Sequence, residues 1–242
     1  MGRQLKVGVL GQAPDDQVDD PGADKRVITW LNMISDQAVG LAGKVVSGTP
    51  RDTLHLVDLV YNADGGRRPE VLITDQGSYS DIVFAIVTLL GFDYRPVLAD
   101  LPDTRLWRID RSADYGRLDC AARGTIDLEA VRRHWPDILR VVGSIHTGQI
   151  CAHDVIRILQ RDGRPTQLGD AMAVYGRIFK TLHVLTFADD PDYRRQLKGM
   201  RKLQKGRHDL ARPGTSSTAA AVNCTALTTP GWKAPSAPWD WS

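Results

Sequence analysis

The segment EVLITDQGSYSDIVFAIVTLLG (Glu70 to Gly91) carries the clearest structural signals in the chain. Its first five residues, Glu70 to Thr74, are short and apolar at the centre, which is typical of a strand covered on both faces. Asp75 follows directly. Ser78 to Asp81 then supplies capping residues for the apolar run Ile82 to Leu90, and the closing glycine is a helix stop. The segment therefore predicts a strand, an aspartate at its end and a helix.

Strand signals dominate before this segment, and helix signals dominate after it. Two short β-branched runs at 27–34 and 38–46 predict neighbouring strands, and Thr49-Pro50-Arg51-Asp52 predicts a helix start. A further short strand is expected at 94–98. Helices are then predicted over 127–142, 151–160, 168–185 and 191–212. In the first of these helices, the spacing predicts four residues facing inward: Leu128, Val131, Trp135 and Leu139.

Composition limits the broad class of the protein. With 242 residues, 42% hydrophobic and 25% charged, the chain can bury one main core. The net charge of +2 does not by itself identify a nucleic-acid binder. Three widely spaced cysteines without a CxxC pair predict neither a disulfide framework nor a zinc site. No apolar run reaches the roughly 20 residues of a membrane span, so we expect a cytoplasmic protein that does not enter the membrane.

The two ends of the chain differ in character from the middle. Residues 11–25 are acidic and rich in turn residues, and we expect residues 1–25 to form a divergent, disordered N-terminus. Residues 213–242 contain one lysine, one aspartate, several prolines and no usable period, and we expect an unrelated disordered tail. The globular unit is therefore predicted over 26–212.

Asp75 is the first candidate for chemistry. A carboxylate at the end of a buried strand, beside a helix N-terminus, lies where open α/β sheets bind their ligands. An aspartate in a turn also caps helices, and the pattern alone favours this capping role. Position therefore does not decide between the two.

Longer stretches of the chain resemble the catalytic region of the Tn-three family of transposases, from about residue 25 to about residue 212. The central match is ITDQGSYSDIVFAIVTLLGFDYRPVLADLPD, with WLNMISDQAVGLAGKVVSGTPRD before it and LWRIDRSADYG after it. Three later stretches match as well: RRHWPDILRVVGSIHTG, VIRILQRDGRPTQLGDA and YGRIFKTLHVL.

The resemblance implies an α/β fold with a ribonuclease-H-like mixed sheet, followed by a mainly helical region. It also implies a DDE transposase, in which two aspartates and a glutamate hold two Mg²⁺ ions, or Mn²⁺ in their place. Two such ions can activate an attacking hydroxyl and stabilise the leaving oxygen in phosphoryl transfer. The expected reaction nicks transposon ends and joins them to target DNA, so the expected partner is DNA.

The family's three acids carry over only in part. Asp75 matches the second acid and is the expected metal ligand. The first would fall at or before Met1 to Arg3, but no acid precedes Asp15, so we expect the sheet to be incomplete and its neighbouring strand to have an open edge. The third belongs to a Leu-x-Glu-Gly-Arg-His motif, and Lys205 stands in the place of its glutamate.

This replacement predicts weakened metal binding and an inactive chain. A lysine puts a positive charge where two divalent cations need an anion. Asp209 lies one helical turn further on and is a weak substitute, because its side chain is shorter and Mg²⁺ demands strict octahedral geometry.

The last predicted helix is the candidate for DNA contact. Its basic residues are Arg194, Arg195, Lys198, Arg201, Lys202, Lys205, Arg207 and Arg212. From the pattern alone a solvated basic face is at least as good an explanation; in a transposase, phosphate contact is the better one.

Two other functions remain open. The chain can be a non-catalytic module that binds DNA or a full-length transposase and inhibits it. It can also be a metal-dependent nuclease that uses Asp75, Asp209 and an acid from the Asp15 to Asp24 segment.

Overall fold

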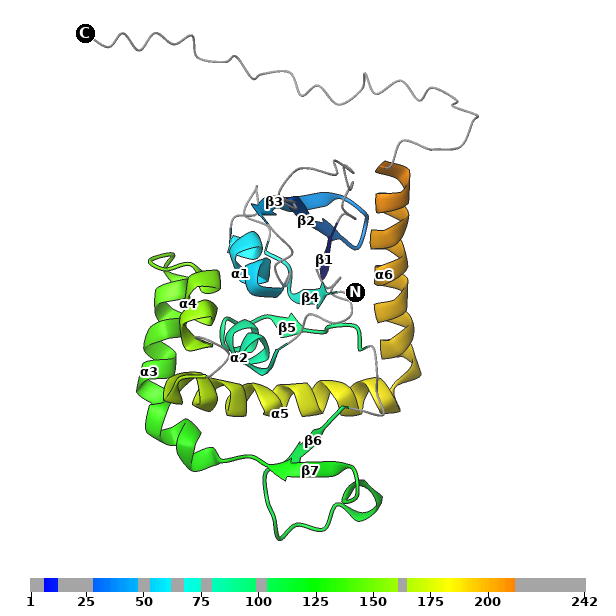
Figure 1. The fold of residues 1–242 in the computed structure, drawn as a ribbon. Coiled ribbons are helices and arrows are strands. Elements are labelled where there is room, and N and C mark those ends of the chain that lie inside the picture. The colour runs from blue at the N-terminus through cyan, green and yellow to red at the C-terminus, as the bar shows by residue number, and fades with distance from the viewer. Residues whose placement is uncertain are drawn as a thin grey trace, which may run out of the picture.

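A mixed sheet forms the centre of the protein. The computed structural model describes residues 7–12, 28–47, 53–61, 68–74, 80–98, 104–160 and 165–211. Its main sheet has five strands in the order β3-β2-β1-β4-β5 (Figure 1). They are β1 (Val7–Gln12), β2 (Ile28–Ser35), β3 (Gly40–Ser47), β4 (Val71–Thr74) and β5 (Asp93–Tyr94). The strands predicted for 27–34, 38–46 and 70–74 are therefore confirmed.

Strand β1 corrects the expectation of a disordered N-terminus for residues 7–12. It pairs with β2 in the antiparallel sense and with β4 in the parallel sense, so it lies between them. The edge that was expected to be open is paired over these residues. The local pattern of VGVLGQ is weak because it contains two glycines, and the strand depends on partners that come later in the chain. The predictions for residues 1–6, 13–25 and 213–242 concern positions outside the described part of the chain.

The helices follow the predicted order. They are α1 (Thr53–Tyr61), α2 (Asp81–Leu89), α3 (Leu128–His146), α4 (Ala152–Leu159), α5 (Gln167–Asp189) and α6 (Pro191–Ala211). Ser80 caps α2, and Gly91 beyond its end has a φ of 89°, as a helix stop requires. Among the described helices none is both long and apolar enough to cross a membrane.

Two features of the middle region differ from the prediction. Leu139 on α3 was expected to face inward but is 47% exposed, because Ile138 and Val142 occupy the buried face of the helix. The chain between β5 and α3 also forms a small ribbon that the sequence did not predict. It consists of β6 (Leu106–Arg108), the short 3-10 helix η1 (Gly116–Leu118) and β7 (Ala122–Thr125).

Helices cover both faces of the sheet. On one face the apolar side chains of α1 and α2 pack with Leu31, Met33 and Leu72. On the other face the carboxyl end of α5 and the first half of α6 pack on alternate strand residues such as Ile73. Figure 1 shows α6 running along one side of the sheet and α5 crossing beneath α2. Successive side chains of β4 therefore point to opposite faces of the sheet and pack in two separate apolar clusters.

Helices α2 and α5 cross with their backbones in close contact. A Cβ atom at Gly176 would lie 1.7 Å from the carbonyl oxygen of Asp81 and 3.0 Å from the backbone nitrogen of Ala85. Both neighbours are backbone atoms and cannot rotate away. The crossing therefore requires glycine at this position.

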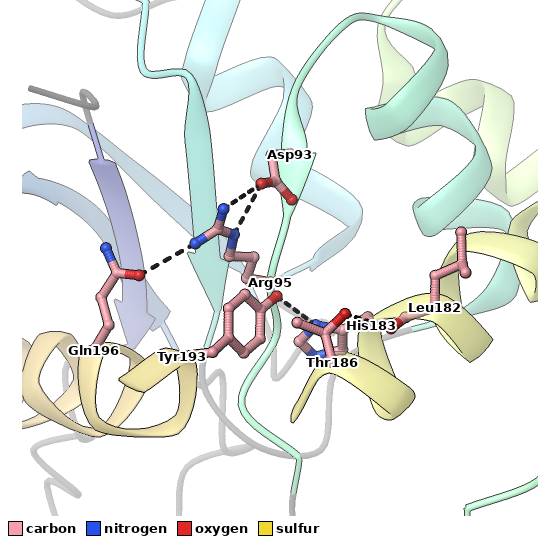
Figure 2. Close-up of polar contacts among 7 residues, drawn as sticks. All are labelled: Asp93, Arg95, Leu182, His183, Thr186, Tyr193 and Gln196. Atoms are coloured by element: carbon pink, nitrogen blue, oxygen red, sulfur yellow. Dashed lines mark hydrogen bonds and ion pairs between the residues drawn. The ribbon is translucent and has the colours of Figure 1, made fainter. Parts of the chain in front are cut away.

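A buried histidine fixes the elbow between α5 and α6 (Figure 2). His183 Nε2 lies 2.9 Å from the carbonyl oxygen of Pro96, which can only accept, so this nitrogen carries the proton. Nδ1 therefore accepts a hydrogen bond of 2.8 Å from the hydroxyl of Tyr193. Arg95 lies over the Tyr193 ring at 4.8 Å and hydrogen-bonds to Gln196, which adds two further contacts to α6.

Burial controls ionisation in this elbow. It lowers the pKa of His183 from 6.5 to about 4, because the charged imidazolium would lose its solvation. Burial likewise raises the pKa of Tyr193, so the phenol stays protonated and continues to donate to His183. The hydrogen bond between His183 and Tyr193 therefore joins two neutral side chains at pH 7.

We expect Gly176→Ala to destabilise the protein by about 2 kcal/mol or more, because the added methyl group pushes α2 and α5 apart. Gly143→Ala is the matched control: it also lies in a helix, and its Cβ would meet nothing within 4 Å. The control should change stability by no more than about 1 kcal/mol, on the stabilising side. Urea unfolding followed by circular dichroism measures both, and equal effects would contradict the close crossing.

The protein should lose stability between pH 6.5 and 4 through His183. Between these pH values His183 is protonated in the unfolded chain but stays neutral in the folded protein. The free energy of unfolding therefore falls as pH falls. The loss reaches at most about 3 kcal/mol. In His183→Gln, urea midpoints measured between pH 7.5 and 4.5 should fall less steeply than in the wild type. Parallel curves would show that His183 does not titrate in this way.

Candidate catalytic edge and nucleic-acid interface

The predicted metal ligand Asp75 lies outside the described residues, but the strand that precedes it is described. Strand β4 ends at Thr74, which is buried and whose hydroxyl lies 3.1 Å from the hydroxyl of Tyr94. The backbone nitrogen of Val97 donates to the carbonyl of Thr74, so the chain beyond β5 continues the ladder to the last residue of β4. The parallel strands β1, β4 and β5 thus present their carboxyl ends at one edge of the sheet.

Strand β1 contributes no carboxylate to this edge. Its parallel register places Leu10 opposite Thr74, so the next residues, Gly11 and Gln12, reach the level at which the chain leaves β4. The strand reads VGVLGQ and contains no aspartate or glutamate. An acid that partners Asp75 cannot come from these six positions.

Helix α6 docks on the sheet at the same level. Gln204 Nε2 donates to Asn32 Oδ1 over 2.5 Å, and both side chains are only 6% exposed. Asn32 on β2 is in turn paired with Gly11 on β1. Leu197 is fully buried nearer the start of the helix. Two anchors along α6 therefore fix which face of the helix meets the sheet.

Lys205 follows Gln204 on α6 and is exposed. The resemblance assigns this position to the third acid. It lies next to Gln204, the residue that anchors α6 to the sheet, and it holds a cation. The backbone of α6 continues to Ala211, but the side chains of Arg207 and Asp209 lie outside the described part of the structure. Asp209 stays a prediction as a substitute ligand.

A basic stripe runs along the outer face of α6. We define it by four exposed residues at the spacing i, i+3, i+4 and i+7: Lys198, Arg201, Lys202 and Lys205. This spacing puts them on one side of the helix. Residues 193–208 contain no aspartate or glutamate, so the formal charges along this stretch of the helix have one sign only. The stripe can therefore attract a polyanion.

The first basic residues of α6 have partners within the protein. The guanidinium of Arg194 donates to the carbonyls of Phe187 and Ala188, at 2.7 and 2.6 Å, and so caps the carboxyl end of α5. Arg195 pairs with Asp192 one turn earlier. Asp190 accepts from the backbone nitrogens of Asp192 and Tyr193 and so caps the start of α6. Arg194 thus has a structural role that the charge pattern did not reveal.

Sequence reasoning missed a second charged cluster, at the start of α2. Asp81 accepts from Arg177 and from Lys180 on α5, each at 3.0 Å. Arg177 also lies 4.4 Å from the centre of the Trp107 ring. The groove beside this cluster includes Asp170, so its charges balance and it is no basic channel. The cluster ties α2 to α5 across the glycine crossing; the spacing of Arg177 and Lys180 on one helix face was the available signal.

The described residues bring no ready-made metal site together. Within them no three histidine, cysteine, aspartate or glutamate side chains lie close enough to hold one ion. Asp75 and the side chain of Asp209 lie outside these residues. A three-ligand site at this edge would therefore need at least one ligand from outside the described residues.

Comparison with known proteins identifies the family. A sequence profile described as the Tn3 transposase DDE domain matches residues 22–215. The chain is 65% identical over 184 residues to the transposase for transposon Tn4556 of Streptomyces fradiae, which covers 76% of this chain and 21% of that protein. It is 40% identical over 187 residues to the transposase for transposon gamma-delta of Escherichia coli strain K12, covering 77% and 19%.

A third relative extends the match further along this chain. The transposase for transposon Tn501 of Pseudomonas aeruginosa is 33% identical over 211 residues, covering 87% of this chain and 21% of that protein. The chain thus spans about a fifth of the length of these relatives. Because the profile covers most of its residues, the chain belongs to the family of Tn3 transposase DDE domains.

Proposed function

We propose that this chain is a partial catalytic domain of a DNA transposase, with a ribonuclease-H-like fold, whose metal-dependent strand cleavage and strand transfer are impaired. The observation that carries the proposal is the family match over residues 22–215, combined with Lys205 on the helix that docks beside the edge following β4. Its substrate would be DNA at transposon ends and in the target.

The donor set does not fit a two-metal centre. Two divalent ions close together need several carboxylate oxygens, because each ion prefers hard anionic ligands. Asp75 is one such ligand by resemblance. β1 carries no acid, and Lys205 brings a positive charge that raises the free energy of a nearby cation. We therefore derive no catalytic step through Mg²⁺ or Mn²⁺ for this chain.

DNA binding does not need the missing acids. The stripe of four cations on α6 is exposed, and the helix behind it is fixed by Leu197, the Asn32–Gln204 hydrogen bond and the His183 elbow. Because the helix backbone is already fixed, contacts between these cations and phosphates would cost side-chain entropy but no ordering of the backbone. We leave Arg194 out of this interface because it caps α5. Arg207 stays a candidate from sequence alone.

A second function is favoured by the contrast between the basic stripe, which the chain has, and the full set of carboxylates, which its donor set does not provide. If the chain retains the stripe and lacks the acids, it can occupy transposon ends or bind a full-length transposase without cutting, and so inhibit transposition. The third alternative, a nuclease that uses Asp75, Asp209 and an acid from the Asp15 to Asp24 segment, requires metal-dependent nicking.

We expect no Mg²⁺- or Mn²⁺-dependent nicking of supercoiled DNA by the purified chain. Asp75→Ala and Lys205→Glu should be equally silent, because β1 still supplies no acid when the third acid is restored. Conversion of supercoiled to open circular plasmid measures this, with circular dichroism to show that each variant is folded. Nicking by the wild type that Asp75→Ala abolishes would establish the nuclease and overturn the proposal of impairment.

We expect the double variant Lys198→Gln/Lys202→Gln to bind duplex DNA more weakly and with a salt slope lower by about two units, about 0.9 for each phosphate contact. The control is Arg132→Gln/Arg140→Gln on α3, which removes the same charge from residues that pair with Glu129 and Asp137. Fluorescence anisotropy from 50 to 300 mM salt gives both slopes. Equal losses in the two variants would show that only net charge matters.

A further inference from the structure

Strand β3 is an edge strand of the main sheet. It pairs with β2 on one side, and among the described residues no strand lies on its other side. Figure 1 shows it at the outer end of the sheet, above α1. Within the same part of the chain, no backbone group of Gly40–Ser47 forms a hydrogen bond with anything other than β2. The described structure therefore presents a flank of unpaired donors and acceptors along β3.

The sequence of β3 does little to protect this edge. Edge strands usually block a further strand because they are short or carry charges, prolines or bulges. Strand β3 has eight residues, no proline and a single charged residue, Lys44. Its pairing with β2 is irregular only near the Gly40 end and continues without a shift over residues 42–47. The strand is therefore long and regular enough to pair with another one.

The exposed side chains of β3 suit the approach of another backbone. Gly43 and Val45 are exposed, whereas Lys44 between them is half-buried and Val46 is buried. A glycine within a strand often marks a place where another backbone comes close. Val45 is 65% exposed, more than any other large apolar side chain among the described residues. A β-branched side chain of this kind packs well beside a neighbouring strand.

The edge is fixed in place before any partner binds. The turn between β2 and β3 is held by Ser35, whose Oγ accepts from the backbone nitrogens of Gln37 and Val39 at 3.2 Å each. The backbone nitrogen of Ser35 also donates to the carbonyl of Val39. Behind the strand, Val46 belongs to the same buried apolar cluster as Leu56 on α1. A partner strand would therefore lose little entropy in ordering the surface that it meets.

The charge on β3 indicates which strand fits it. Lys44 forms no ion pair with any acid of the described residues, and β3 itself contains no acid. A second copy of β3 would bring another lysine and no carboxylate. A different strand with an aspartate or glutamate opposite Lys44 would gain a cross-strand pair of opposite charges, which stabilises strand pairing. The favoured occupant is therefore an acidic segment of another protein.

We propose that β3 is a docking edge for an extended segment of a partner protein, which joins the sheet as a further strand. The segment carries β-branched side chains beside Val45 and a carboxylate opposite Lys44. Backbone hydrogen bonds supply the affinity, and the side chains set the register. The proposal does not depend on DNA binding, because the basic stripe belongs to α6.

Fluorescence anisotropy of the full chain with two labelled synthetic peptides, TVTVDVTV and TVTVKVTV, tests the proposal. The wild type should bind the aspartate peptide at least about fivefold more tightly than the lysine peptide, and Lys44→Glu should reverse this order. Val45→Ser should weaken the binding of both peptides. The control Ile158→Ser makes the same change at a 62% exposed site on α4 and should weaken neither.

Backbone methylation of the aspartate peptide separates strand addition from contact through side chains alone. Successive residues of a strand direct their N–H groups to opposite edges. N-methyl groups on one alternate set of residues should therefore abolish binding, and those on the other set should be tolerated. Equal losses from the two sets overturn the proposal. So does the absence of binding to either peptide, or a preference that Lys44→Glu leaves unchanged.

Discussion

The hydrogen bonding of β1 to two strands at once is the constraint on which the rest of the sheet depends. With the order β3-β2-β1-β4-β5, the pair β2–β3 and the pair β4–β5 are joined only through this strand. Each of its flanks satisfies backbone groups of a neighbour that would otherwise be buried beneath helices without partners. The carboxyl ends of β1 and β4 lie at one edge of the sheet because these two strands run parallel. Helix α6 can bind Asn32 at this level because β1 also pairs with β2.

Helix α6 connects the fold to both proposed functions. Its inner face carries the polar anchor Gln204 and the apolar anchor Leu197, and its outer face carries the basic stripe. Rotation of the helix by one residue would move Lys205 by about 100° around the axis. The buried amide pair with Asn32 opposes such a rotation, because it would leave both groups without their partner. The same contact thus sets the position of Lys205 and the direction of the basic stripe.

Local signals in the sequence predicted the elements that form from local interactions. Helix α2 was identified by its serine cap, its apolar run and Gly91, and these residues take those roles in the structure. Strand β1 was not predicted, because six residues with two glycines become a strand only through distant partners. The β6–β7 ribbon was missed for a different reason: its strands are only three and four residues long, too short for a clear alternating pattern.

The candidate site shows the same division. The charge count on the last helix predicted a basic element, and the helical period gave its face. The count could not show that Arg194 caps α5, because that contact depends on the elbow between two helices. The Asp81 cluster and the exposure of Leu139 likewise follow from how helices cross. Asp75, Arg207 and Asp209 stay predictions from the resemblance.

The Asn32–Gln204 contact also has a consequence for how the chain folds. It joins residues separated by 172 positions, and β1 can be completed only after β4 has been synthesised. Non-local pairings of this kind slow folding, because a long loop must close before the contact rewards it. During synthesis one face of the sheet therefore stays uncovered until the end of α5 and then α6 emerge. In this interval the nascent chain is most exposed to aggregation, and a chaperone would have most effect then.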